Sequence, residues 1–178
     1  MRLSISQKSG LGKAAKHYAQ SVGLAQEYLA ARGLSSEIAR RAGLGVVHDP
    51  HTGHDGMVGR LSIPYITNTG VVDIRFRSLD GSDPKYLGLP GAKTHMYNVR
   101  AFQKDSDVIA ICEGEIDAIT AHFMCGIPAV GLSGANGFKP WYARAFGDYR
   151  KVIVMADGDQ PGRDLGKRIA QQIDTAVV

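Results

Sequence analysis

The chain contains 178 residues, of which 44% are hydrophobic, and its formal net charge is +4. A chain of this length and composition can bury a core in one domain or two small ones, so we expect a soluble globular protein. No apolar run approaches the length of a membrane span and Met1–Gly10 is too polar for a signal peptide, which argues against a membrane partner and predicts a cytoplasmic location. Cys112 and Cys125 lack the paired spacing of a zinc site and are expected to be buried thiols.

Basic and acidic residues are unevenly distributed along the chain. Residues 1–60 hold eight basic and four acidic side chains, whereas residues 108–178 hold seven and eight. A basic segment beside an acidic one suits a polyanionic substrate that metal ions bridge to the carboxylates. The alternative is that the basic surplus is an ordinary solvated surface.

The first half predicts a helical hairpin and then a β-hairpin. Gly33 ends a helix over Ala25–Arg32, and a second helix opens at Ser35 or Ser36 and closes at Gly43. A strand is expected at Leu44–Val47, and two more at Leu61–Thr67 and Val71–Ser78 on either side of the turn at residues 68–70. Lys85–Gly88 follows the turn-rich residues 80–84 and precedes another loop. Period-two alternation places Ile74 and Phe76 on one face of the hairpin, and Asp73, Arg75 and Arg77 on the other.

The segment His48–Gly59 is rich in glycine and histidine. His48, His51 and His54 recur at every third residue, which is compatible with metal binding, but no further ligand is evident. A solvated loop is the preferred interpretation.

From Val108 the pattern alternates between strand and helix. Short, β-branched and nearly uncharged runs at Val108–Cys112 and Lys151–Met155 predict strands buried on both faces of a parallel sheet. Further strands are expected at Ala129–Leu132 and from Thr175. Helices are expected between them, at Ile116–Cys125, around Pro140–Phe146 and at Arg163–Ile173. The second half is therefore predicted to be an α/β domain with a parallel sheet and flanking helices.

Two acidic clusters follow strands of this sheet, the sequence CEGEID at residues 112–117 and MADGDQPG at residues 155–162. Ligands of open α/β sheets bind beyond the carboxyl ends of the strands, so the four carboxylates of Glu113, Asp117, Asp157 and Asp159 are expected to converge. Crowded carboxylates repel one another unless a divalent cation lies between them, and Mg²⁺ or Mn²⁺ is the oxygen-seeking ion that suits such a site.

The second cluster also fits a structural interpretation. Asp-Gly-Asp followed by Pro-Gly is also a good turn, and aspartate is a common helix N-cap. A calcium loop would need ligands where Pro161 and Arg168 stand, and the glycine spacing fits neither a P-loop nor a dinucleotide-binding fingerprint.

The acidic clusters resemble the two motifs of the Toprim domain, which primases, topoisomerases and some nucleases share. Glu113-Gly114 with Asp117 matches the first motif, and DGDxxG at residues 157–162 matches the second. The first half resembles the catalytic core of bacterial and phage-type (DnaG-like) DNA primases, in the sequences LAQEYLAARGLSSEIARRAGLGVV (24–47), GRLSIPYITNTGVV (59–72) and RSLDGSDPKYLG (77–88). This resemblance covers nearly the whole chain.

The resemblance implies a Toprim-type, Rossmann-like parallel sheet at residues 107–178, preceded by a smaller mixed α+β primase subdomain at residues 1–106. It implies that metal ions held by Glu113, Asp117, Asp157 and Asp159 support synthesis of RNA primers from ribonucleoside triphosphates on single-stranded DNA. Glu113 could instead act as a general base, and Asp117 as the N-terminal carboxylate of its helix, whereas Glu115 is expected to stand outside the site. It further implies a groove for nucleotide and template lined by Arg60, Arg77, Lys85 and Tyr86.

Two departures from the family pattern keep rival functions open. The zinc-binding module is not seen, and the third acidic motif is expected after the strand that starts at Thr175, so the chain looks like a fragment of a longer phage primase or primase-helicase, located in the host cytoplasm. One rival is a Toprim nuclease, and the other is a nucleic-acid-binding module that has lost synthesis and is fused to a replicative helicase.

Overall fold

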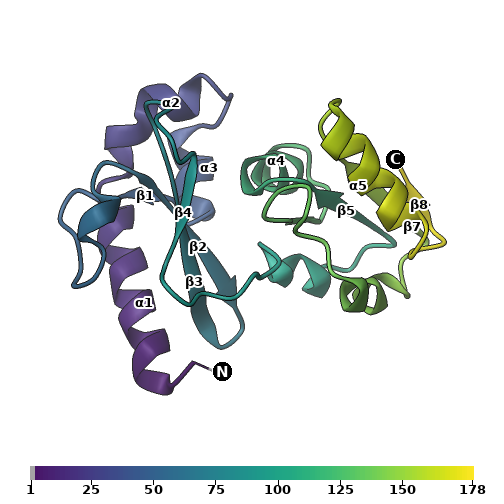
Figure 1. Cartoon of the computed structure of the whole chain (residues 1–178), viewed down its shortest axis with the longest axis horizontal. Helices are drawn as coiled ribbons and strands as arrows, with labels where there is room; N and C mark the ends of the chain where they lie inside the picture. Colours follow the sequence, from purple (N-terminus) through teal and green to yellow (C-terminus); the bar gives the residue numbers. More distant parts are fainter. Residues whose placement is uncertain (1–2) are drawn as a thin grey trace. The chain divides into compact units, whose positions relative to one another are not determined.

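The computed structural model describes residues 3–178 and shows two compact units, Met1–Lys93 and Thr94–Val178, each with its own sheet (Figure 1). The domain boundary expected at residues 106–107 lies further along the chain than this division and stays a prediction. Within residues 3–178, no helix is both long and apolar enough to cross a membrane.

The first unit is built on an antiparallel four-stranded sheet in the order β1-β2-β3-β4. Its strands are β1 (Gly45–Val46), β2 (Leu61–Thr67), β3 (Gly70–Arg77) and β4 (Tyr86–Gly88). Its helices are α1 (Ile5–Ala19), α2 (Gln26–Ala30) and α3 (Ser36–Arg41), with short 3₁₀ turns η1 (Val22–Ala25) and η2 (Asp55–Met57). The predicted helical hairpin and the β2–β3 hairpin are both present.

The two faces of β3 differ as their alternation predicted. Ile74 and Phe76 are buried in a cluster with Ala14, Ala15 and Tyr18 of α1. Arg75 and Arg77 lie on the opposite face and are half-buried, whereas Asp73 on that face is buried. The charged face is therefore partly covered rather than fully solvated.

Helix α1 was not predicted from the sequence. Ser4 caps it by accepting a hydrogen bond from the backbone of Gln7, whose side chain in turn accepts one from the backbone of Ser4. The end of the helix packs tightly on β1, since a Cβ atom at Gly45 would lie 2.2 Å from the carbonyl carbon of Tyr18. Glycine at the start of β1 is what allows this close approach.

The second unit is built on a parallel four-stranded sheet in the order β6-β5-β7-β8, which confirms the predicted fold class. Its strands are β5 (Val108–Cys112), β6 (Ala129–Gly131), β7 (Lys151–Met155) and β8 (Ala176–Val177). Its helices are α4 (Glu115–Ile119) and α5 (Gln160–Ala170), with 3₁₀ segments η3 (Val99–Gln103) and η5 (Pro140–Phe146). The helix expected over 116–125 is α-helical only to Ile119 and continues as the π-helical turn η4 (Thr120–Met124).

The core of this unit holds the acidic loops in place. Ile109 and Ile111 of β5 and Val152 of β7 are buried with Leu165 and Ile169 of α5. β5 is buried on both faces as predicted, whereas β7 buries only Val152 and Val154, so the two-sided burial expected for β7 was wrong. The pairing of the two strands fixes where their last residues emerge. Of the two cysteines, Cys112 is buried as expected, but Cys125 is exposed after the π-helical turn, so the expectation for Cys125 was wrong.

Candidate functional site

The two acidic motifs meet at the end of the parallel sheet. Strands β5 and β7 are neighbours with Cys112 paired to Met155, so both chains leave the sheet at the same level. The backbone N–H of Glu113 donates to the carbonyl of Met155 at 3.0 Å, and the backbone N–H of Asp157 donates to Glu113 Oε2 at 3.1 Å. The structure thus brings Glu113 to the backbone of Asp157, although the two residues are far apart in the sequence. We call Glu113, Asp117, Asp157 and Asp159 the acidic corner.

Asp159 begins helix α5. Its Oδ1 accepts a hydrogen bond of 2.8 Å from the backbone N–H of Gly162, so the N-cap interpretation of the second motif is correct for this carboxylate. The turn is closed so tightly that a Cβ atom at Gly162 would lie 2.1 Å from the carbonyl oxygen of Asp157. A side chain at position 162 would therefore collide with the backbone of Asp157, so the last residue of the DGDxxG motif has to be glycine.

Asp117 lies in the first turn of α4 at the same end of β5. A Cβ atom at Gly114 would lie 2.9 Å from Asp117 Oδ2, so this carboxylate folds back over the Gly114 backbone. Burial raises the pKa of the Cys112 thiol to about 12, and the negative charge of Asp117 adds to the rise. Glu115, unlike Asp117, is almost fully buried. Burial is the main cause that raises the pKa of Tyr97, and the negative charge of Glu115 is the second.

The corner has the right donor chemistry for a hard cation but not a completed ligand set. Carboxylate oxygens are the ligands that Mg²⁺ and Mn²⁺ prefer, and Glu113 can keep its bond to Asp157 through Oε2 while Oε1 binds an ion. Asp159 can likewise keep its cap through Oδ1 and offer Oδ2. In the described part of the chain, no three histidine, cysteine or acidic side chains lie close enough together to hold a metal ion. The expected convergence of all four carboxylates on one ion is therefore not seen among residues 3–178.

In the first unit, arginine and tyrosine side chains form a stacked group on the charged, partly covered face of the sheet. Tyr86 on β4 lies between two arginines of β3, with Arg75 at 4.6 Å and Arg77 at 5.0 Å from its ring centre. Arg77 also donates a hydrogen bond to the Tyr86 hydroxyl. It lies 5.8 Å from the centre of the Tyr28 ring on α2, and Arg32 stacks over the same Tyr28 ring at 3.7 Å. We call these five residues the Arg–Tyr cluster.

Tyr28 and Arg32 were missed by the sequence analysis. Their spacing of four residues on a helix would place them side by side, which is the signal that could have suggested a pair. The Tyr28 hydroxyl is buried and has no hydrogen-bond partner within residues 3–178. Buried hydroxyls are normally satisfied, so a water molecule or a bound ligand is expected to complete this one.

The remaining predicted binding residues flank the turn before β4. Arg60 donates to the carbonyl of Pro84 at 2.8 Å, and Lys85 is exposed, with its carbonyl accepting from the backbone of Ser78. Asp80 within the turn accepts from the Ser82 backbone, and hydrogen bonds from Ser82 and then Ser78 hold the pKa of Asp80 well below its ordinary value. This turn thus holds Lys85 beside β4, which carries Tyr86 of the Arg–Tyr cluster.

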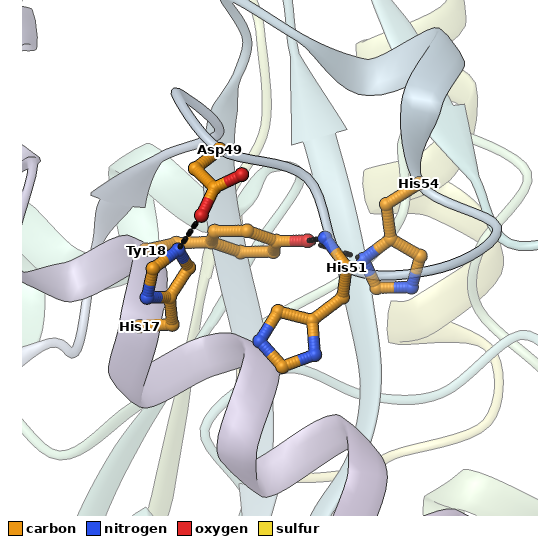
Figure 2. A network of polar contacts seen from close by, with 5 residues as sticks. All are labelled: His17, Tyr18, Asp49, His51 and His54. Atoms are coloured by element: carbon orange, nitrogen blue, oxygen red, sulfur yellow. Dashed lines mark hydrogen bonds and ion pairs between the residues drawn. The ribbon is translucent and has the colours of Figure 1, made fainter.

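The histidine-rich loop is more ordered than a solvated loop, so that interpretation was wrong for His54. Figure 2 shows the Tyr18 hydroxyl between the backbone N–H of His51, which donates to it at 3.0 Å, and Nδ1 of His54, at 2.7 Å. His54 is buried, and burial lowers its pKa, while burial raises that of Tyr18. His17 pairs with Asp49 at 3.3 Å beside them. This network joins α1 to the loop and explains its order without a metal.

Comparisons with known proteins agree with the fold and the motifs. The Toprim-like family matches residues 110–178. The gene 57 protein of Mycobacterium phage D29 is 46% identical over 123 residues, which cover 66% of this chain and 80% of that protein. The DNA primase of Pseudomonas aeruginosa is 26% identical over 188 residues, covering 84% of this chain.

A solved structure, that of the DnaG primase catalytic domain bound to single-stranded DNA, superposes with a TM-score of 0.73 over 95% of this chain and 68% of that one, at 22% identity. The fold and acidic corner therefore define a Toprim protein with the architecture of a primase core. More particularly, the chain belongs to the same family as the gene 57 protein of Mycobacterium phage D29, which is 46% identical to it. The present chain spans only 28% of the length of the Pseudomonas primase.

Proposed function

We propose that this chain is the catalytic core of a DNA primase, which joins ribonucleotides on a single-stranded DNA template by metal-dependent nucleotidyl transfer. The proposal rests on the hydrogen bond from the backbone N–H of Asp157 to the carboxylate of Glu113, because this bond joins the two acidic motifs at the carboxyl ends of β5 and β7. Catalytic groups of open α/β sheets lie beyond the carboxyl ends of the strands.

Within this proposal Glu113 and Asp157 hold Mg²⁺ or Mn²⁺, with Asp159 and Asp117 as further ligands. The ion, when bound, neutralises the triphosphate and aligns the 3′-hydroxyl for in-line attack. The protein's own contribution is positional. Asp159 begins α5 and Gly162 keeps the loop closed, so the carboxylates are held on a rigid strand end rather than on a free loop.

The Arg–Tyr cluster, with Arg60 and Lys85 beside it, is the proposed surface for nucleotide and template. Arginine forks bind phosphate oxygens, and tyrosine rings and guanidinium planes stack on unpaired bases without regard to sequence. The DnaG relative solved with single-stranded DNA makes such DNA the natural polymer to test.

The test is RNA synthesis on single-stranded DNA with ribonucleoside triphosphates and Mg²⁺ or Mn²⁺, by the protein alone and with its reading frame continued past Val178. Glu113→Gln and Asp157→Asn are expected to lower synthesis by roughly a hundredfold or more. Asp148→Asn removes an exposed carboxylate of the same unit outside the corner and is the matched control. A replicative helicase added to the reaction tests the expected partner.

Two other outcomes would each support one of the alternative functions. Metal-dependent cleavage of the template, lost in Glu113→Gln, would show a Toprim nuclease. Tight binding of single-stranded DNA by folded protein with neither synthesis nor cleavage would show a binding module that has lost its chemistry.

A further inference from the structure

A groove in the first unit is not accounted for by nucleotide chemistry. It runs beside α1 and the β2–β3 hairpin, which lie alongside each other in Figure 1, and has a volume of about 860 Å³. Much of its wall is aliphatic, including Pro64 and Ile66 of β2, Val71 of β3 and, from the start of the helix, the exposed Ile5. Exposed aliphatic surface in a concave site marks a place where another apolar group can be buried.

The charges that line the groove all have one sign. Lys8, Lys13 and Lys16 come from successive turns of α1, and no aspartate or glutamate is among the described residues that line it. Lys8 donates to Thr69 Oγ1 at the tip of the hairpin at 2.8 Å, which fixes one end of the groove. An aliphatic groove edged with lysines is complementary to a segment that carries both apolar and acidic side chains.

Gly12 lies in the wall of the groove, and a Cβ atom there would meet nothing within 4 Å. A residue without a side chain at this point leaves the groove open for the close approach of another chain.

The lining residues decide between a nucleic acid and a protein as the occupant. None of the described residues that line the groove is aromatic. Unpaired bases are bound mainly by stacking on aromatic rings or arginine planes, which the Arg–Tyr cluster offers and this groove does not. Aliphatic walls instead fit the Leu, Ile or Val side chains of an amphipathic helix.

We propose that the groove between α1 and the β2–β3 hairpin is a docking site for an acidic amphipathic helix of a partner protein. The aliphatic side chains of the helix lie over Pro64, Ile66 and Val71, its backbone passes close to Gly12, and its acidic side chains pair with Lys13 and Lys16. This interaction is independent of the acidic corner, and it gives the first unit a role in assembly besides its role in binding template.

The test uses a fluorescent sixteen-residue peptide with leucine at helical i, i+3, i+4 and i+7 spacing and glutamate elsewhere, and fluorescence anisotropy with the whole protein. Two matched peptides carry glutamine or lysine in place of glutamate. We expect the acidic peptide to bind roughly tenfold more tightly than the glutamine peptide, with the lysine peptide weakest.

Two kinds of variant locate the binding. Gly12→Leu fills the groove with a side chain that meets no protein atom near its Cβ, and should abolish binding while keeping the melting temperature. Gly10→Leu adds the same side chain to the same helix outside the groove and should bind normally. Lys13→Glu with Lys16→Glu should weaken binding about tenfold, whereas Lys93→Glu with Lys104→Glu, an equal change of charge elsewhere, should change it less than about twofold.

Three results would overturn the proposal. The first is an acidic peptide that binds no better than the glutamine peptide, or does not bind at millimolar concentration. The second is binding that survives both Gly12→Leu and the Lys13/Lys16 reversal. The third is an oligothymidylate that competes with the peptide and is itself released by Gly12→Leu, which would make the groove a nucleic-acid site.

Discussion

The acidic corner and the Arg–Tyr cluster are built by different parts of the chain. Backbone hydrogen bonds and tight turns fix the corner, where the N–H of Asp157 reaches Glu113 and Gly162 closes on the Asp157 carbonyl. The cluster is instead made of side chains stacked from α2, β3 and β4. Substitutions that change the backbone should therefore damage the corner and the fold together, whereas side-chain truncations in the cluster should change binding and leave the fold intact.

The largest effect is expected at Gly162. A methyl group there would lie 2.1 Å from a backbone oxygen, which cannot move away as a flexible side chain can. Gly162→Ala should cost more than about 2 kcal/mol in the free energy of unfolding and should abolish nucleotidyl transfer. Urea unfolding followed by the fluorescence of Trp141, which lies in the second unit, measures this effect.

The control for that variant is four residues earlier in the same motif. Gly158→Ala places its methyl group where nothing lies within 4 Å, so the protein should stay within about 0.5 kcal/mol of the wild type. Equal destabilisation by both variants would show that glycine content, rather than the contact with Asp157, determines the stability of the loop.

A smaller effect is expected in the Arg–Tyr cluster and beside it. Arg77→Ala and Lys85→Ala should each weaken binding of single-stranded DNA by roughly three- to tenfold and lower the dependence of log K on log salt by about one. Their melting temperatures should stay close to that of the wild type. A large loss of stability with unchanged binding would mean that the two side chains are structural and that the two regions do not differ as described.

The smallest effect concerns pH and the Tyr18 network. His54 has a lowered pKa because it is buried, so the unfolded chain binds more protons than the folded one at mildly acidic pH. Its contribution to stability is present above the ordinary histidine pKa of about 6.5 and is lost as pH falls below it. His51 adds to the lowering by its charge, Asp55 opposes it, and the pair of His17 with Asp49 lies nearby.

Melting temperatures measured between pH 7.5 and pH 5 check this expectation. The His54→Gln variant should be less stable at pH 7.5 and should lose less stability on acidification than the wild type. His48→Gln, at an exposed position of the same loop, should keep the wild-type slope. An unchanged slope in His54→Gln would assign the pH dependence to other groups.

Local patterns were sufficient for much of the fold. The strands Val108–Cys112 and Lys151–Met155 have the bounds that their uncharged β-branched runs predicted, and the glycines at 33 and 43, both with positive φ, end the helical segments as expected. Because buried parallel strands end at one level, the approach of Glu113 to Asp157 could also be predicted. The catalytic roles of Glu113, Asp157 and Asp159, and the role of Asp117 as a metal ligand, stay a proposal.

Features that depend on distant packing could not be predicted. Helix α1 carries glycines at positions 10 and 12 and buries only small residues and Tyr18, so its sequence shows little apolar periodicity. His54 is ordered by Tyr18, which lies far from it in the sequence. Tyr28 joins the Arg–Tyr cluster because Arg77, which is distant in the sequence, lies 5.8 Å from its ring, and no local pattern predicts that contact.

The central claim is that the two acidic motifs form one cation site, and manganese binding tests it most directly. An ion bound only by the folded protein raises its melting temperature by mass action. Millimolar Mn²⁺ should therefore raise the melting temperature of the wild type, and Glu113→Gln alone or Asp157→Asn with Asp159→Asn should each abolish the rise, while Asp148→Asn keeps it. A rise that survives the loss of either motif, or no rise in the wild type at any manganese concentration, would contradict a shared site.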